Sequence, residues 1–279
     1  MGQIAVDLDG SELTQRTSVA GQIKDRVFRA RGLELAADMI AAHQDHKPLQ
    51  AAALGFIQNI VSGGAFPETE TRRAAGVPLL AAIVDAMNRL AESSAVQHFG
   101  SVAIAAIVAR NPASQKEVLA ASLRADTAIE LGAHKAIIRG VVRYASMETT
   151  NDPSYGEFTI HSAGELQDEM ILVAPGSVGF VGCQALELLV NIGGTRGNER
   201  RVDALLEAGG FTALVAAIEN DANFGNLEAF QQSQSFGPIM SLTNALMGQV
   251  NEDVEEHNQP AGFVALGDAL YAMAGHDEL

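Results

Sequence analysis

Tryptophan is absent from this chain of 279 residues, and the single cysteine, Cys183, cannot form an intramolecular disulfide. The apolar neighbours of Cys183, which include Phe180, Val181 and Leu186, predict a buried structural thiol. Aromatic residues make up only 5% of the chain, so Ala, Leu, Ile and Val must fill the core. Such small side chains favour closely packed helices. The apolar fraction of 47% excludes an intrinsically disordered chain.

Basic residues are also scarce, because 18 Lys and Arg stand against 34 Asp and Glu, for a formal charge of −16. A chain this acidic repels phosphate backbones and anionic membrane surfaces, so neither nucleic acid nor a membrane is expected as a partner. A protein or peptide of basic character fits the charge better. A simpler interpretation stays open, in which the charge only keeps an Ala-rich surface solvated.

Long hydrophobic runs are missing too. No stretch reaches the roughly 18 uninterrupted apolar residues of a transmembrane helix, and residues 1–16 lack the basic and apolar regions of a secretory signal. These absences predict a cytoplasmic protein. The last four residues, His276-Asp277-Glu278-Leu279, spell an endoplasmic-reticulum retrieval signal. A location in the lumen of that compartment is therefore the alternative.

Motifs that carry catalysis or bind a cofactor do not appear. His43 and His46 have metal-ligand spacing, but no second pair follows, and their polar surroundings predict a solvated turn. The glycine-rich segment 193–197 lacks the lysine of a phosphate-binding loop. No nucleophile elbow and no Cys/His set is present. The sequence therefore predicts no enzyme activity, no cofactor, no metal site and no small-molecule substrate.

What the chain does contain is an internal repeat. A sharp break followed by an apolar helical stretch recurs at positions 32, 76, 122, 164, 209 and 262. The intervals of 44, 46, 42, 45 and 53 residues match a solenoid unit of about 40–47 residues, with an insertion in the last. The break residue is glycine except at Ser122, because a helix that turns at once favours a left-handed residue. The insertion, residues 220–237, is either a partner-contacting clamp or a plain connection.

A longer apolar helical stretch follows each break and predicts the last helix of each unit. Since such a stripe is too wide to bury alone, neighbouring units must stack into one continuous core. The sequence thus predicts an all-α solenoid over residues 17–274, with an extension (1–16) before it and a tail (275–279) after it. The expected last helices lie at residues 49–61, 96–108, 136–147, 181–192 and 236–247.

These units resemble armadillo repeats. The best copy is residues 181–218, where VGCQALELLVNIGGTRGNERRVDALLEAGGFTALVAAI follows the family pattern nearly throughout. HEAT repeats are the nearest alternative, and the recurrent Ala-Gly turn favours armadillo. The resemblance implies a right-handed α-α superhelix of about five three-helix repeats plus a C-terminal half repeat. It also implies a non-catalytic scaffold or adaptor that binds a partner segment in a concave groove lined by the third helices.

The resemblance also implies which residues line the groove. An asparagine position, whose carboxamide offers a donor and an acceptor to a bound peptide backbone, maps to Asn59, Asn191 and Asn244. Asparagines near a helix end also cap local backbone, which is the alternative interpretation. Arg143 would be an isolated basic groove residue. The position that is often Trp in nuclear-import receptors holds no Trp here, so the clamp for basic localisation signals is missing. Its occupants are Gly55, Val102, Val142, Glu187 and Met240.

Two further functions stay open at this point. One is a co-chaperone that resembles the armadillo-type nucleotide-exchange factors of heat-shock chaperones, some of which work in the endoplasmic reticulum. The other is a structural subunit embedded in a larger complex, which predicts a large exposed apolar patch.

Overall fold

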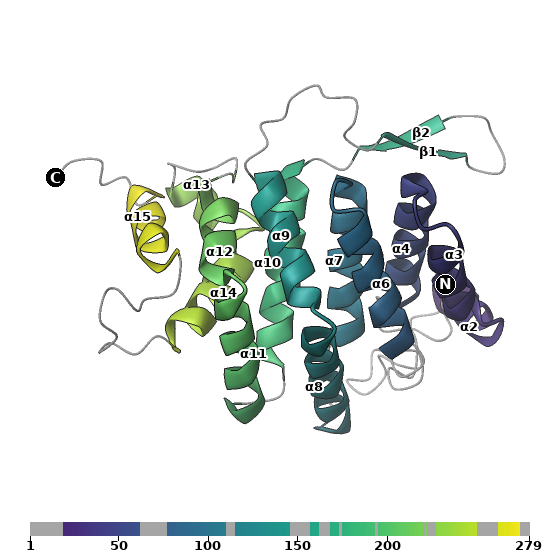
Figure 1. Cartoon of the computed structure of the whole chain (residues 1–279), viewed down its shortest axis with the longest axis horizontal. Coiled ribbons are helices and arrows are strands. Elements are labelled where there is room, and N and C mark those ends of the chain that lie inside the picture. Colours follow the sequence, from purple (N-terminus) through teal and green to yellow (C-terminus); the bar gives the residue numbers. More distant parts are fainter. Residues whose placement is uncertain are drawn as a thin grey trace, which may run out of the picture.

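The structure is a computed structural model, and it describes residues 19–61, 77–109, 115–145, 157–161, 168–172, 175–192, 195–219, 221, 227–249 and 262–273. These residues are predominantly helical, and the helices stand side by side along the longest axis of the molecule (Figure 1). Helices α2 and α3 stand at one end of this stack, and α15 stands at the other.

The helices are α2 (Val19–Arg29), α3 (Gly32–Ala42), α4 (Lys47–Val61), α6 (Val77–Arg89), α7 (Ser94–Val108), α8 (Gln115–Glu130), α9 (Ala133–Ala145), α10 (Pro175–Asn191), α11 (Thr195–Glu207), α12 (Gly210–Glu219), α13 (Leu227–Gln231), α14 (Phe236–Met247) and α15 (Phe263–Met273). A two-stranded antiparallel hairpin, β1 (Glu157–His161) and β2 (Asp168–Leu172), lies between α9 and α10 in the chain. Its register pairs Phe158 with Ile171 and Ile160 with Glu169.

Most helices belong to one of two rows. In the second-helix row, α3, α6, α9, α12 and α15 pack each on the next, and in the third-helix row α4, α7, α10 and α14 do the same. Helices α2, α8 and α11 each contact members of both rows. Neither row could bury its apolar stripe alone, so each helix shelters the next, as the sequence pattern predicts.

One apolar core runs between the rows from Leu33 in α3 to Ala269 in α15. Glycines let helices pack closely at two points, where even a methyl side chain would collide with the neighbouring helix. A Cβ atom on Gly100 of α7 would lie 2.6 Å from the Met87 side chain of α6, and one on Gly182 of α10 would lie 2.3 Å from Val141 of α9. The expectation of a core built from small and aliphatic side chains is confirmed.

A left-handed residue precedes four helices of the second-helix row. These residues are Gly132 (φ 80°), Gly209 (φ 91°) and Gly262 (φ 83°), with Arg31 (φ 59°) in the first unit. The predicted breaks at 209 and 262 are confirmed, and the break near 32 falls one residue earlier. The break predicted at 76 lies outside the described residues. The one predicted at Ser122 is wrong, because Ser122 lies inside α8 and the chain turns at Gly132 instead.

Two more expectations for the middle of the chain are wrong. The stretch 136–147 is expected as a third helix, but its described part, residues 136–145, lies in α9 and belongs to the second-helix row. Residues 168–172, expected in a helix after the break at 164, form strand β2; position 164 itself lies outside the described residues. The all-α prediction is confirmed for the rest of the described chain.

These errors come from an insertion, residues 146–174, that forms a long connection between α9 and α10. Helix α9 packs on α10 across it, and α10 packs directly on α7. Because of this connection, α9 and α10 begin 42 residues apart, at residues 133 and 175, which is close to the expected unit length. A spacing in the forties therefore persists in the sequence, although α9 and α10 belong to different rows and pack on each other.

Buried glutamines make equivalent hydrogen bonds at two places in the stack. Gln50 at the start of α4 donates through Nε2 to the carbonyl oxygens of Ile40 and His43, both at 2.8 Å. Gln97 at the start of α7 donates in the same way to Met87 (2.8 Å) and Leu90 (3.3 Å). Residues 40, 43 and 50 thus correspond to 87, 90 and 97. In both places the glutamine bonds carbonyls in or just after the last turn of a helix of the second-helix row, and His43 and Leu90 also accept the backbone N–H groups of His46 and Ser93.

The expected insertion at 220–237 is partly described. It contains α13, in which Phe230 is fully buried and packs edge-on against Phe236 with ring centroids 5.5 Å apart. These contacts favour an anchored connection over a free clamp. The extension 1–16 and the tail 275–279, with its retrieval-type ending, lie outside the described residues.

Candidate functional site

Each helix of the third-helix row presents one stripe of side chains away from the core. In α4 the stripe is Ala52, Phe56 and Asn59, at the spacing of one helical face. In the other three helices the half-buried and exposed positions recur at the same spacing. We call these four stripes together the third-helix face: Ala52, Phe56 and Asn59 of α4, Val102 and Ala106 of α7, Gln184, Glu187 and Asn191 of α10, and Met240, Ser241 and Asn244 of α14.

Polar side chains join α10 and α14 on this face. The Nδ2 group of Asn191 donates to Glu187 Oε1 and to Ser241 Oγ, both at 2.9 Å. The Ser241 hydroxyl in turn donates to Glu187 Oε1 at 3.1 Å. Three residues from helices about fifty positions apart in sequence are therefore locked in one arrangement. Two neutral donors hold the Glu187 carboxylate in place on the face without neutralising its charge.

The other predicted groove residues of this row lie on the same face. Asn59 of α4 and Asn244 of α14 are exposed, and neither side chain hydrogen-bonds to any residue that the structure describes. Met240 of α14 is half-buried. The structure thus brings Glu187 and Asn191 into one cluster, with Met240 and Asn244 on the adjacent helix, and places Asn59 at the far end of the row. Contact of these residues with a partner stays a prediction.

Arg143 does not belong to this set. It lies on α9 in the second-helix row and pairs with Glu92, in the turn after α6. Two more side chains of α9 contact α6 or the turn after it. Arg139 hydrogen-bonds Asn88, and the Tyr144 hydroxyl donates to the Ala91 carbonyl at 3.1 Å. These contacts tie α9 to α6. Arg143 is thus a link between two second helices, and its expected position on a third helix is wrong.

Charge separates the two rows. Between its first and last residues, the third-helix row carries only Lys47 and Glu187 as charged side chains. The second-helix row carries nine, two of them acidic on α3 and three of them basic on α9. In full they are Glu34, Asp38, Asp85, Arg89, Lys135, Arg139, Arg143, Glu219 and Asp268. An acidic chain therefore leaves one whole row nearly without charge.

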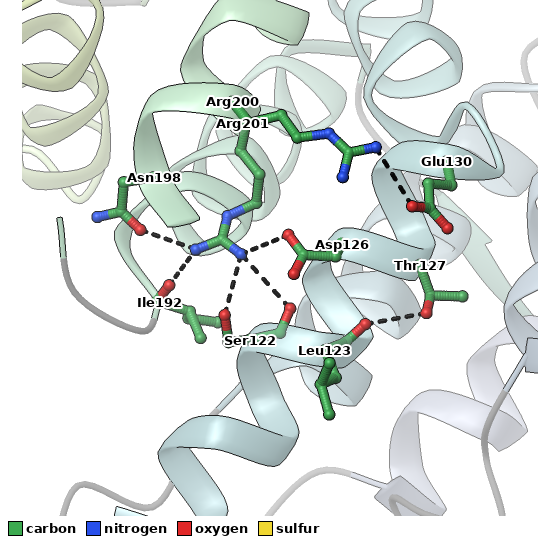
Figure 2. A network of polar contacts seen from close by, with 9 residues as sticks. All are labelled: Ser122, Leu123, Asp126, Thr127, Glu130, Ile192, Asn198, Arg200 and Arg201. Atoms are coloured by element: carbon green, nitrogen blue, oxygen red, sulfur yellow. Dashed lines mark hydrogen bonds and ion pairs between the residues drawn. The ribbon is translucent and has the colours of Figure 1, made fainter. Parts of the chain in front are cut away.

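A heavily bonded side chain, Arg201, lies outside the residues that the sequence pattern indicates. Arg201 of α11 is fully buried, and its guanidinium donates to Asp126 (2.7 Å), to Asn198 (2.7 Å) and to the hydroxyl of Ser122 (3.1 Å), as Figure 2 shows. It also bonds the carbonyl oxygen of Ile192, just after the last residue of α10. A single cation thereby joins α8, α10 and α11.

Arg124 of α8 has the same role one unit earlier. It is buried and donates to the carbonyl oxygens of Ile107 (2.7 Å) and Ala109 (3.3 Å) at the end of α7. Arg124 precedes Gly132 by eight residues, and Arg201 precedes Gly209 by the same number. This shared spacing is the signal that could have identified both. Both arginines stabilise helix ends, so they position the third-helix face without being part of it.

Two buried side chains, Cys183 of α10 and His134 of α9, have strongly shifted pKa values. Burial raises the pKa of the Cys183 thiol to about 12, which confirms the expected inert, buried cysteine. Burial, with a smaller effect of Lys135, lowers the pKa of His134 to about 4, so this imidazole is neutral at pH 7. His43 and His46 are exposed in the turn before α4, as expected, and His46 Nδ1 accepts from the Leu49 amide at 3.2 Å.

Within the described ranges, no three His, Cys, Asp or Glu side chains are placed to hold a metal ion. No described helix has the length and apolar character needed to cross a membrane. No protein-family model matches the chain, and comparisons with curated proteins and with solved structures find no match either.

Proposed function

We propose that this protein is a non-catalytic scaffold of the armadillo type, and that it binds an extended segment of a partner protein across the third-helix face. The right-handed superhelix and the grouping of the two rows into armadillo units are part of this proposal. Two findings support the architecture: the rows themselves, and the capping residues Gln50/Gln97 and Arg124/Arg201, which recur at the ends of helices in these rows.

The observation that carries the binding role is the low charge of the third-helix face. Solvated surfaces are normally rich in charged side chains. This face instead offers Phe56, Val102 and Met240 beside amides, with Glu187 as its lone carboxylate. Depletion of charge, with aromatic residues and Met present, is typical of the central part of a protein interface.

The chemistry of the face also defines the segment that fits it. Asn59 and Asn244 each offer a donor and an acceptor, which match the alternating N–H and C=O groups of an extended backbone. The fixed Glu187 carboxylate would pair with a single Lys or Arg. The expected partner segment is therefore extended and largely apolar, with one basic residue at the level of α10. This agrees with the basic partner that the net charge favours.

A peptide-library selection tests the proposal with a matched pair of variants. Peptides from a random library would be selected on the wild-type protein and then measured on Ala52→Arg and on Ala41→Arg. Both alanines are exposed on helices, but Ala52 lies on the third-helix face and Ala41 lies on α3. We expect Ala52→Arg to lower the affinity for most selected peptides by about tenfold or more. Ala41→Arg should leave these affinities within about twofold of the wild-type values.

A second variant tests the charge preference. In Glu187→Gln the side-chain oxygen can still accept the hydrogen bonds from Asn191 and Ser241, but the negative charge is lost. The variant should therefore bind peptides that contain Lys or Arg more weakly and bind neutral peptides as before. If the selected peptides bind Ala52→Arg as tightly as wild type, or lose their affinity on Ala41→Arg instead, the third-helix face is not the binding surface.

A further inference from the structure

The two ends of the second-helix row are chemically different, and neither is covered by another helix of the row. Helix α15 is the last member and packs on α12, and α3, with α2 beside it, is the first (Figure 1). In repeat proteins the terminal helices normally carry a polar outer face, because an apolar one would be left in water. Both ends here depart from that pattern.

At the C-terminal end, α15 has an apolar outer face. Leu266 and Ala269 are buried against the rest of the protein. Val264 and Tyr271 lie on the opposite side of the helix and are 57% and 47% exposed. Exposed Asp268 lies between them on that side. The outer face of α15 is thus two large apolar side chains around one carboxylate.

At the N-terminal end, two large apolar side chains are exposed as well. Ile23 of α2 is 55% exposed and Leu35 of α3 is 61% exposed. Arg26 and Arg29 on α2 and Arg31 in the turn that follows are exposed, as are Glu34 and Asp38 on α3, and Arg31 pairs with Glu34 at 3.3 Å. This end therefore combines the same apolar content with an excess of basic charge that lies on α2.

Charge along the chain reinforces the contrast. After Arg201 the sequence holds twelve Asp and Glu and not a single Lys or Arg. Residues 24–31, by comparison, hold four basic side chains and one acidic. Most of the net charge of −16 therefore belongs to the part of the chain that ends in α15, and the basic cluster lies at the far end of the stack.

From this complementarity we infer a self-association surface: the outer face of α15 in one molecule docks on the α2–α3 end of a second copy. Val264 and Tyr271 pack against Ile23 and Leu35, and Asp268 meets the basic residues of α2. The second copy thereby continues the second-helix row past α15.

Such an interface is heterologous, so it leaves one free end on every assembly. Mass should therefore rise steadily with concentration instead of stopping at a dimer. Because opposite charges attract across the interface, association should weaken as the Debye length falls from about 10 Å at 0.1 M salt to about 3 Å at 1 M. Binding at the third-helix face is a separate property, since none of its residues takes part.

Sedimentation velocity of the full chain, with end-blocked variants, tests the inference. Leu35→Glu blocks the N-terminal end and Tyr271→Glu blocks the C-terminal end, so each variant alone should stay monomeric. An equimolar mixture should form a dimer and nothing larger, because each partner supplies one intact end. Leu119→Glu on α8 is the matched control, since Leu119 is 65% exposed and lies on neither end. It should assemble like wild type.

Several outcomes would overturn the inference. A wild-type chain that is monomeric over the whole concentration range has no such interface. A mass that stops at a dimer, with Leu35→Glu still dimeric, means a symmetric contact between two α15 helices. Loss of assembly in Leu119→Glu means association through another surface. Circular dichroism on each variant separates loss of the contact from loss of the fold, and Ala52→Arg should leave assembly unchanged.

Discussion

The second-helix row and the third-helix row are built from the same kinds of core residue, yet their outer sides differ in chemistry. The outer side of the second-helix row carries charges that pair across helices, as Arg143 does with Glu92. In the third-helix row, α10 and α14 are joined through neutral groups, Asn191 and Ser241, around one carboxylate, Glu187. The charged row is thus the one that stays exposed to solvent, and the nearly uncharged row is the one that we propose a partner segment covers.

The rows also differ in how their ends are secured. The α7 and α10 ends of the third-helix row are held from within by the buried arginines Arg124 and Arg201. The α3 and α6 ends of the second-helix row are held by the neutral side chains Gln50 and Gln97. The four experiments below test these differences between the rows and the packing of one row on the other, from the largest expected effect to the smallest.

Replacing Arg201 with alanine should have the largest effect. The substitution leaves Asp126 without its buried partner and exposes the end of α10, so we expect a loss of about 3–5 kcal/mol in unfolding free energy. Arg200→Ala is the control, because Arg200 is 73% exposed and pairs with an exposed Glu130 at 3.3 Å. It should cost at most about 1 kcal/mol. Urea denaturation measures both, and equal losses would contradict the internal role of Arg201.

The next effect depends on pH and belongs to the second-helix row. His134 is buried on α9, and its pKa is lowered from 6.5 to about 4. Between pH 6.5 and 4 the histidine binds a proton in the unfolded chain but not in the folded one. The free energy of unfolding is therefore highest above pH 6.5 and falls as the pH drops toward 4. The size of this pKa shift limits the loss of unfolding free energy to about 3 kcal/mol.

Comparing urea midpoints at pH 7.5 and pH 5 should show a smaller loss on acidification for His134→Leu than for wild type. His43→Gln, which changes an exposed histidine of the turn before α4, should behave like wild type. An unchanged pH dependence in His134→Leu would mean that other groups carry the acid sensitivity.

The third experiment tests the contact between the rows through two glycines of α10. A Cβ on Gly182 would lie 2.3 Å from the Val141 side chain, whereas one on Gly179 would meet no atom within 4 Å. We expect Gly182→Ala to cost about 1–3 kcal/mol through overpacking. Gly179→Ala should stabilise the protein by about 0.5–1 kcal/mol, because alanine favours the helix. Thermal melts suffice, and the same sign for both changes would disprove the close approach.

The smallest effect on stability should come from the third-helix face itself. Asn59 is exposed, and no hydrogen bond ties its side chain to the residues that the structure describes. Asn59→Ala should therefore change the unfolding free energy by less than about 0.5 kcal/mol while weakening peptides selected on the wild type. A large loss of stability, with peptide affinity unchanged, would assign Asn59 a structural role.

Much of this architecture follows from the sequence, because apolar periodicity and glycine breaks are local signals. The last helices expected at 49–61, 96–108, 181–192 and 236–247 all fall in the third-helix row. Periodicity cannot tell a second helix from a third, however, since both bury a broad apolar stripe. For that reason the sequence alone places 136–147 in the wrong row and Arg143 in the groove.

The site was less accessible to prediction than the fold. Asn191 could be picked out by resemblance, but its bond to Ser241 joins residues fifty positions apart and needs the packing of α10 on α14. Arg201 looks in sequence like any surface arginine, and only its spacing to Gly209, repeated by Arg124 and Gly132, sets it apart. Its burial depends on three helices meeting.

The insertion between α9 and α10 has a consequence for how the molecule assembles. In a regular solenoid each helix finds its partners a short distance along the chain, so order can spread from unit to unit. Here α10 must reach α7 and α9 across residues 146–174, and closing a longer loop costs more conformational entropy. Folding should therefore proceed from either side of this junction, and we expect formation of the α7–α10 contact to be the slow step.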